Sequence, residues 1–332
     1  MQYRKISGQR VTSIGLGCMN LSHAYGEPLS ESEGTRVLHA ALDAGVNHFD
    51  TAALYGFGKN EILLGKALKA HRDKIFLASK CGMAGVNGKR VIDGRPSTIR
   101  ATVEQSLSSL QTDVLDLCYL HRWDKKVPIE DSVGELSRLV EEGKIKSIGL
   151  SEVSANTLRK AHGIHPIAAV QTEYSLWTRN PEIAMLDACK ELDIAFVAFS
   201  PLARGFLSGF VATPNEMVNG DIRKGMPRFQ PENMEKNRSL LSILNKISAE
   251  LSCSPSQLAI AWILHKYEHI LAIPGTTNIQ HLLENLDAVN VAISDEYMSS
   301  LNDAFEYSNI SGARYPAATQ AEIDTEEFKS SL

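Results

Sequence analysis

The chain has few cysteines and no large excess of charge of either sign. Its 332 residues include five cysteines, and its formal net charge is −5. No two cysteines form a CxxC pair, so the sequence indicates neither a disulfide framework nor a cysteine-based zinc site. The small net charge gives no indication of nucleic acid or of an anionic membrane as a partner. These features predict a protein of a reducing compartment, which we take to be the cytoplasm.

Long apolar segments are also absent from the sequence. The start, Met1 to Lys5, does not open the apolar core of a secretory signal, and no apolar run reaches the length of about 18 residues that would span a membrane. Hydrophobic residues make up 43% of the chain, which is enough for one large core. We therefore expect a single domain over residues 1–308. A polar tail over residues 309–332 would then be either a mobile terminus or a flap over a pocket.

Short apolar runs alternate with amphipathic stretches along the chain. Continuous apolar runs are typical of parallel strands that are buried on both faces. Eight such strand–helix units close naturally into a (β/α)8 TIM barrel, and an open doubly wound sheet is the competing arrangement. The expected strands cover residues 12–18, 46–50, 75–80, 114–120, 145–150, 167–171, 194–200 and 270–273. The expected helices cover residues 30–44, 60–70, 97–110, 129–142, 155–162, 183–192, 237–251, 256–266 and 279–289.

Three segments lie outside this repeating pattern. Residues 3–11 are expected to form a short hairpin that turns at Gly8 and plugs the N-terminal end of the barrel. Residues 81–96 and 203–234 are longer than ordinary connections, and such loops are usually functional or disordered. Both follow strands, so in a barrel both lie on the C-terminal face, where barrel enzymes hold their sites.

Ionisable side chains stand at the ends of three successive expected strands. Asp50 ends one strand and is followed by Tyr55, while Lys80 and His121 end the next two. A hydride added to a carbonyl carbon leaves negative charge on the oxygen. A phenol, whose usual pKa is about 10, is protonated at neutral pH and can supply the proton. A lysine held by an aspartate eases release of that proton, and a histidine can orient the carbonyl oxygen. The pattern predicts reduction of a carbonyl group.

Each of these residues also has an ordinary structural explanation when it is taken alone. A strand-end aspartate often forms a turn, an aromatic residue before glycine is usually packing, and a terminal lysine or histidine is often solvated. Their joint occurrence at the ends of neighbouring strands is what favours chemistry.

The segments that carry these residues resemble the aldo-keto reductase family over nearly the whole chain. The similarity rests on residues 47–56, 77–80 and 119–124. It implies a (β/α)8 barrel and hydride transfer from NADPH, with NADH possible, to a small carbonyl substrate. Gly17-Cys18-Met19 and Tyr174-Ser175-Leu176-Trp177 resemble the branch with auxin-induced-type and pyridoxal reductases. The implied catalytic residues are Asp50, Tyr55 as general acid, Lys80 and His121.

The resemblance also implies where the dinucleotide binds. Asn20 replaces the third glycine of a GxGxxG motif, so residues 15–20 are a weak Rossmann signal. In the family, this turn brings the backbone close to the nicotinamide. Glu152 stands where many members have Asn, and a carboxylate cannot donate a hydrogen bond to the carboxamide. His281 stands where many members bind the 2′-phosphate with Arg, and histidine is only partly charged near neutrality. The implied cofactor-binding residues are Gly17, Cys18, Met19, Ser151, Gln171, Phe199, Ser200, Pro201, Leu202, Arg204, Gly205, Ile273, Gly275, Thr276, Thr277, His281, Glu284 and Asn285.

The substrate is expected above the nicotinamide, beside Tyr55 and His121. Its walls would include Tyr25 and Trp123, with Met19 and parts of the two long loops. A largely apolar and aromatic pocket selects loosely, so we expect a broad range of aldehydes or ketones.

Two other functions are compatible with parts of the pattern. A regulatory subunit of the potassium-channel β type shares the resemblance and the catalytic residues and has little turnover. A Schiff-base lyase would use Lys80 as an amine nucleophile, but such an amine needs a lowered pKa and Asp50 would raise it.

Overall fold

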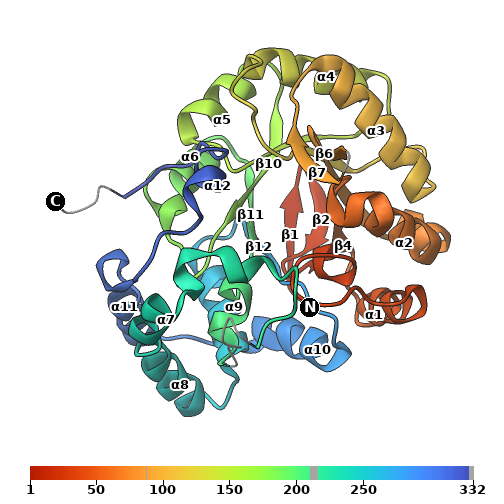
Figure 1. Ribbon diagram of the computed structural model, residues 1–332. Helices are drawn as coiled ribbons and strands as arrows, with labels where there is room; N and C mark the ends of the chain where they lie inside the picture. The colour runs from red at the N-terminus through yellow and green to blue at the C-terminus, as the bar shows by residue number, and fades with distance from the viewer. Residues whose placement is uncertain (87, 210–215, 329–332) are drawn as a thin grey trace.

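The computed structural model describes residues 1–86, 88–209 and 216–328, and its centre is a closed barrel of parallel strands (Figure 1). The first and last strands join through hydrogen bonds: the Gly15 N–H donates to the Ala272 carbonyl at 2.9 Å, and the Ala272 N–H donates to the Ser13 carbonyl at 2.9 Å. This confirms the predicted (β/α)8 barrel. The strands, in order, are β3 (Leu16–Gly17), β4 (His48–Asp50), β5 (Phe76–Cys81), β8 (Leu117–Leu120), β9 (Ile148–Ser151), β10 (Ile167–Glu173), β11 (Ala195–Phe199) and β12 (Ile270–Ile273).

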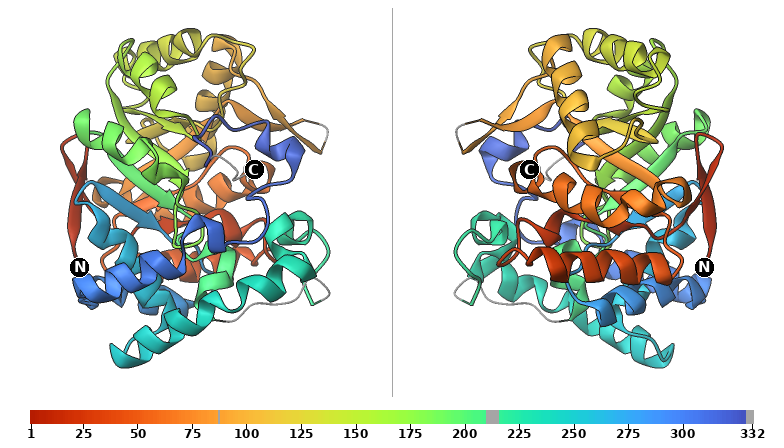
Figure 2. Two further views of the ribbon diagram at one scale, coloured as in Figure 1. Left: turned by 90° about the vertical axis from the view of Figure 1, so that its left-hand side faces the viewer. Right: turned by 90° about the vertical axis from the view of Figure 1, so that its right-hand side faces the viewer.

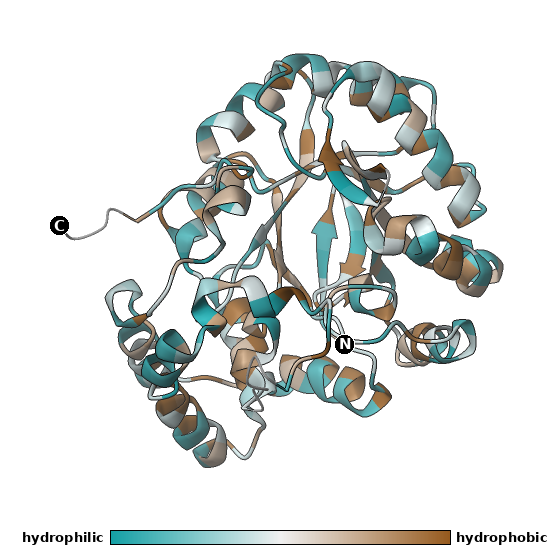
Figure 3. Ribbon diagram, viewed as in Figure 1, coloured by the Kyte–Doolittle hydropathy of each residue, from teal (hydrophilic) through white to brown (hydrophobic). Residues whose placement is uncertain are grey.

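Helices surround the barrel, and each carries hydrophobic and hydrophilic residues (Figure 3). Their starts follow local sequence signals. Ser30 caps the first helix and forms a capping box with Glu33, as Ser254 does with Gln257. The ring consists of α1 (Glu31–Asp43), α2 (Lys59–Leu68), α3 (Pro96–Leu110), α4 (Ile129–Glu141), α5 (Ala155–His162), α6 (Met185–Glu191), α9 (Pro255–Lys266) and α10 (Ile279–Asp287).

Some elements differ from the expectation. The expected helix over 237–251 is found as α8 (Leu240–Glu250), and an additional short helix, α7 (Pro231–Asn237), begins inside the segment expected as a loop over 203–234. The loop over 81–96 contains an antiparallel hairpin, β6 (Met83–Val86) and β7 (Lys89–Ile92). The C-terminal part adds α11 (Asp295–Ala304) and α12 (Ala317–Gln320). In the part of the chain that the structure describes, no helix is long and apolar enough to cross a membrane.

The strands place alternate residues inside the barrel. On β5, Phe76 and Ala78 belong to the interior cluster, whereas Leu77 packs against the helices. Two residues beyond Ala78, Lys80 therefore points into the barrel, because successive strand residues face opposite sides. The same alternation on β8, from Leu117 and Tyr119, leads to His121. The layer of the barrel interior at the C-terminal ends of the strands, which is called the upper end below, is thus polar, although the strands are continuous apolar runs in the sequence.

The N-terminal hairpin, β1 (Tyr3–Ile6) and β2 (Gln9–Thr12), closes the other end of the barrel. Ile6 and Val11 join the interior cluster. Arg4 lies beside them and donates to the carbonyls of Leu264 at 2.6 Å, Tyr267 at 2.9 Å and Ile270. Figure 2 shows this hairpin at one end of the barrel and the β6–β7 hairpin and α12 at the opposite end.

The described tail residues, 309–328, fold back onto the C-terminal face of the barrel (Figure 1). The buried Arg314 guanidinium donates to Glu152 Oε1 at 2.6 Å and to Glu173 Oε2 at 3.1 Å. Burial alone would raise the pKa of Glu173, but the guanidinium groups of Arg204 and Arg314 reverse this and lower it to about 2. The tail is therefore anchored by charges that have no access to water.

We expect Arg314→Met to lower the free energy of unfolding by about 3 kcal/mol, because it leaves two buried carboxylates short of a partner. Arg159→Met is the control: it removes an exposed ion pair with Glu191 and should cost about 0–1 kcal/mol. Urea denaturation of the wild type and of both variants measures the difference. Equal losses for the two variants would contradict the role of Arg314 as an anchor.

Candidate active site

The strand ends bring the predicted catalytic groups together at the upper end of the barrel interior. The Lys80 ammonium donates to Asp50 Oδ1 and to the Thr51 carbonyl, the latter at 2.8 Å. Gln171 Nε2 donates to Asp50 Oδ2 at 2.7 Å. Asp50 and Lys80 are both about 1% exposed, so the ion pair is shielded from water and its charges interact strongly.

Tyr55 reaches this group from the loop after β4. The chain turns sharply there, because Gly56, Phe57 and Gly58 all have positive φ, a conformation that glycine adopts without steric cost. The phenol ring stands edge-on to His121, with ring centroids 5.8 Å apart and an interplanar angle of 84°. The Lys80 ammonium lies 4.8 Å from the ring centroid.

The surroundings set the protonation states of these groups. Burial raises the pKa of Tyr55, and the positive charge of Lys80 opposes this only in part. Burial would lower the pKa of Lys80, but Asp50 outweighs this and the pKa is raised. Burial, together with Arg122 and Lys80, holds the pKa of His121 well below its usual value. At neutral pH the site therefore contains a neutral phenol, an ammonium and a neutral imidazole.

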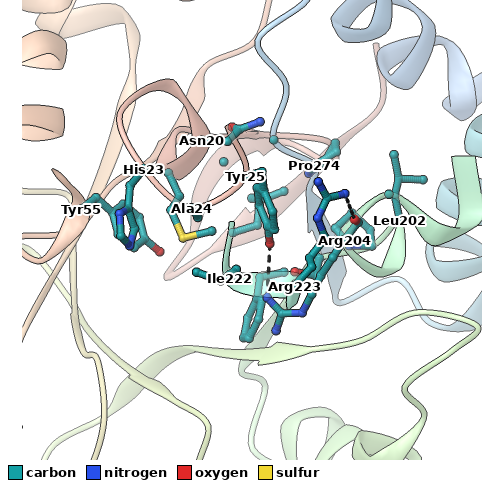
Figure 4. A pocket seen from close by; sticks show the side chains of 18 of the residues that line it. Asn20, His23, Ala24, Tyr25, Tyr55, Leu202, Arg204, Ile222, Arg223 and Pro274 are labelled. Atoms are coloured by element: carbon teal, nitrogen blue, oxygen red, sulfur yellow. Dashed lines mark hydrogen bonds between the residues drawn. The ribbon is translucent and has the colours of Figure 1, made fainter. Parts of the chain in front are cut away.

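These groups form part of the wall of a cavity of about 810 Å³. Figure 4 shows His23 and Tyr55 at one end, Leu202 and Pro274 at the other, and Tyr25 between them. Most of the residues predicted from the sequence line this cavity. They are Gly17, Met19, Tyr25, Asp50, Tyr55, His121, Ser151, Gln171, Phe199, Ser200, Pro201, Leu202, Arg204, Gly205, Ile273, Gly275, Thr276, His281, Glu284 and Asn285.

Four predicted residues do not line the cavity in the described part of the chain. Lys80 lies beneath its wall and is bound to Asp50. Cys18 is buried, with its thiol 3.5 Å from the Leu16 carbonyl. Trp123 donates from its indole to the Val127 carbonyl at 2.8 Å. Thr277 is exposed next to the wall residue Thr276.

Other wall residues were not predicted from the sequence. Some come from the two long loops, whose position on this face was expected, while others come from the tail, where no motif marks them. The segment 119–124, which resembles the family's histidine segment, also contains a wall residue that was not predicted. This residue is Arg122, directly after His121. The additional residues are Asn20, His23, Ala24, Leu54, Met83, Arg90, Arg122, Ser208, Ile222, Arg223, Gly225, Met226, Ser256, Pro274, Tyr315, Pro316 and Thr319.

The loop after β11 crosses the cavity and is held there by Arg204 (Figure 4). Its guanidinium donates to Glu173 Oε2 at 2.7 Å, to the Tyr315 hydroxyl at 3.0 Å and to the Tyr25 hydroxyl at 3.2 Å. Arg223 in turn donates to the Arg204 carbonyl at 3.2 Å and pairs with Asp221 at 2.6 Å. Both arginines of this loop that line the cavity therefore have a carboxylate partner already. The cavity runs beneath a segment that is tied to the barrel and to the tail.

The end of the cavity near α10 fits a dinucleotide. A Cβ atom on Gly17 would come 2.7 Å from the Ile273 carbonyl, and one on Gly275 would come 2.8 Å from the Gly17 carbonyl. Only glycines allow this close passage of backbone beside the cavity. Asn20 Oδ1 is buried at this wall without a hydrogen-bond partner among the described residues. Asn278 caps α10, and His281 and Asn285 follow on the helix. These features provide a long groove with unfilled polar positions.

A barrel with a buried phenol, ammonium and imidazole beside such a groove is the arrangement that a barrel oxidoreductase requires. The chain belongs to the Aldo/keto reductase family, which matches residues 13–306. Its members are enzymes that act on small carbonyl compounds with a nicotinamide dinucleotide.

Known proteins agree with this assignment. The chain is 44% identical over 310 residues to probable aldo-keto reductase 1 of Glycine max, covering 93% of this chain and 89% of that protein. The structure is similar to the glycerol dehydrogenase AKR11B4 from Gluconobacter oxydans, with a TM-score of 0.84, 29% identity and coverage of 92% and 95% of the two chains. It is also similar to the holo form of aldo-keto reductase AKR11C1 from Bacillus halodurans, with a TM-score of 0.74, 26% identity and coverage of 96% and 99%.

Proposed function

We propose that the protein reduces aldehydes or ketones to alcohols with NADPH, and that Tyr55 supplies the proton to the carbonyl oxygen. The observation that carries the proposal is the position of the Tyr55 phenol, which lies in the cavity wall between the buried Lys80 ammonium and the His121 ring. The five free thiols, four of which are buried, support a reducing compartment such as the cytoplasm.

Each of the four predicted catalytic residues has its own role in the proposed reduction. When bound, NADPH supplies the hydride that adds to the carbonyl carbon. Tyr55 gives its hydroxyl proton to the oxygen, and Lys80 stabilises the phenolate that remains. The neutral His121 ring donates a hydrogen bond that orients the carbonyl oxygen. Asp50 holds the ammonium in place, and its second oxygen fixes the Gln171 amide.

The dinucleotide is proposed to lie along the groove from Ser151 to Asn285. Ser151 and Gln171 would bind the carboxamide, and Phe199 would support the nicotinamide ring. The loop that carries Arg204 would cover the pyrophosphate. Because Glu173 already neutralises Arg204, we propose that Arg204 fixes this loop rather than supplying a free charge to the phosphates. The 2′-phosphate would lie near His281 at the start of α10, where helix N–H groups favour an anion.

Tyr55→Phe should lower kcat for reduction by about 10²–10⁴-fold, because the only change is loss of the proton donor. NADPH binding, measured by fluorescence titration, should stay within about twofold of the wild type. Tyr119→Phe is the matched control, since its ring is also near Lys80 but does not line the cavity. A near-normal kcat for Tyr55→Phe would remove the phenol from the reaction.

The pH profile follows from the two pKa directions. Tyr55 acts in its protonated form and its pKa is raised, so kcat/KM for reduction should fall only above about pH 10. The pKa of His121 is lowered, so the neutral ring should persist and no inflection should appear between about pH 6 and 9. Steady-state rates across this range test both statements. An inflection near pH 7 that Tyr55→Phe or His121→Gln removes would contradict them.

His281→Arg should tighten NADPH binding by about tenfold and leave NADH binding unchanged, because a guanidinium binds phosphate oxygens through two parallel N–H donors and only NADPH carries the 2′-phosphate. Dissociation constants for the two cofactors, measured by fluorescence, give the comparison. Gln280→Arg places the same charge on the neighbouring residue, which does not line the cavity, and serves as the control. Equal changes for both cofactors would separate His281 from the phosphate.

A further inference from the structure

Two arginines line the cavity near the proposed reaction centre, and the mechanism above uses neither. Arg122 directly follows His121, and Arg90 lies on β7 of the hairpin that also supplies Met83 to the wall. Both charges act on His121, and that of Arg122 also acts on Tyr55. Both arginines line the same cavity as Tyr55 and His121, and the Arg122 guanidinium contacts the His121 carbonyl.

The Arg122 side chain is fixed but has no counter-charge. Its Nη1 donates to the His121 carbonyl at 2.6 Å and to Ser151 Oγ at 3.3 Å. Its other two nitrogens, Nε and Nη2, make no hydrogen bond or ion pair within the described residues. These two nitrogens are not among the buried polar atoms of the described residues that lack a partner, so they are accessible in the cavity that Arg122 lines. A ligand in the cavity can therefore bind them.

The other arginines of the cavity show the contrast. Arg204 and Arg223, which lie on the loop after β11, pair with Glu173 and Asp221. Arg90 pairs with Glu322 of the tail, but both side chains are about one-third exposed. Arg122 alone among the arginines of the described cavity wall has no carboxylate. The carboxylate nearest to the reaction centre, Asp50, is already bound to Lys80.

The cofactor cannot supply this missing negative charge in the proposed arrangement. Its phosphates would lie beside Gly205, Thr276 and His281, which line the cavity. These residues follow Leu202 and Pro274 in the chain, and Figure 4 shows Leu202 and Pro274 at the other end of the cavity from Tyr55. Its nicotinamide ring is neutral when reduced and positive when oxidised. The remaining candidate is the carbonyl substrate itself.

We infer that the substrate is an aldehyde or ketone that also carries an anionic oxygen group, a carboxylate or a phosphate, which binds to Arg122. A guanidinium binds such groups through two parallel N–H donors, and Nε and Nη2 of Arg122 provide that pair. Arg90, at the more exposed edge, raises the local concentration of anions at the mouth. This inference rests on the proposed carbonyl reduction and narrows its substrate class.

Matched aldehydes test the inference. Each isomer of carboxybenzaldehyde is compared with the nitrobenzaldehyde of the same substitution, because the two groups have similar shape and differ in charge. A second pair, glyceraldehyde 3-phosphate and glyceraldehyde, separates phosphate from carboxylate. The quantity measured is the ratio of kcat/KM for the anionic substrate to kcat/KM for its neutral partner, with saturating NADPH.

Arg122→Met should lower this ratio by about 10–100-fold for at least one pair, as expected for loss of a charge-assisted hydrogen-bonded contact. Arg90→Met should lower it by a smaller factor that disappears at high salt. Lys126→Met is the control: it removes a charge from the same loop at an exposed position outside the cavity wall and should leave the ratio unchanged.

The outcomes separate the inference from the function on which it rests. If Arg122→Met lowers kcat/KM equally for both members of every pair, Arg122 only positions His121, and the inference is overturned while carbonyl reduction stands. If the wild type reduces neither the neutral nor the anionic aldehydes, the proposed function fails, and the substrate class fails with it.

Discussion

The buried ion pair between Lys80 and Asp50 is the interaction around which the upper end of the barrel is organised. An ammonium in this position is stable only if an opposite charge is in direct contact with it, because removing it from water costs several kcal/mol. Asp50 meets that charge with one carboxylate oxygen and uses the other to hold Gln171. A single side chain thereby links the group beside the phenol to the residue proposed to bind the carboxamide. In the proposed reaction, the relative positions of proton donor and hydride donor depend on this one carboxylate.

Burial determines the protonation states of the two neighbours of this ion pair, Tyr55 and His121. Burial moves the pKa of Tyr55 upward and that of His121 downward. Both groups therefore remain neutral around pH 7, one as a phenol that can lose a proton and the other as an imidazole that can donate a hydrogen bond without carrying charge. Two neutral groups beside a fixed ammonium are suited to stabilising an oxygen that becomes negative during a reaction.

The strand-end residues could be predicted from local patterns in the sequence. The same patterns favoured the barrel over an open sheet, and the family resemblance decided between the two. Continuous apolar runs marked the strands and their ends, whereas the structure shows which residues of each strand face inward. The contacts of the tail could not be predicted in this way. Arg314 meets Glu152 and Glu173 across most of the fold, and no spacing in the sequence connects them. Arg204 was similarly misleading as an isolated residue, since only the fold shows that Glu173 already occupies its guanidinium.

The β1–β2 hairpin, which closes the end of the barrel away from the cavity, affects how Lys80 exchanges protons with water. Ile6 and Val11 fill that end, and Arg4 ties it to three backbone carbonyls. The interior between this plug and Lys80 is packed with apolar side chains such as Phe76 and Leu117. In the described part of the chain, the barrel interior is therefore closed at the hairpin end and borders the cavity at the other end. Protons that exchange between the Lys80 ammonium and bulk water pass through the same opening as the ligands. A ligand that fills the cavity therefore separates the ammonium from bulk water.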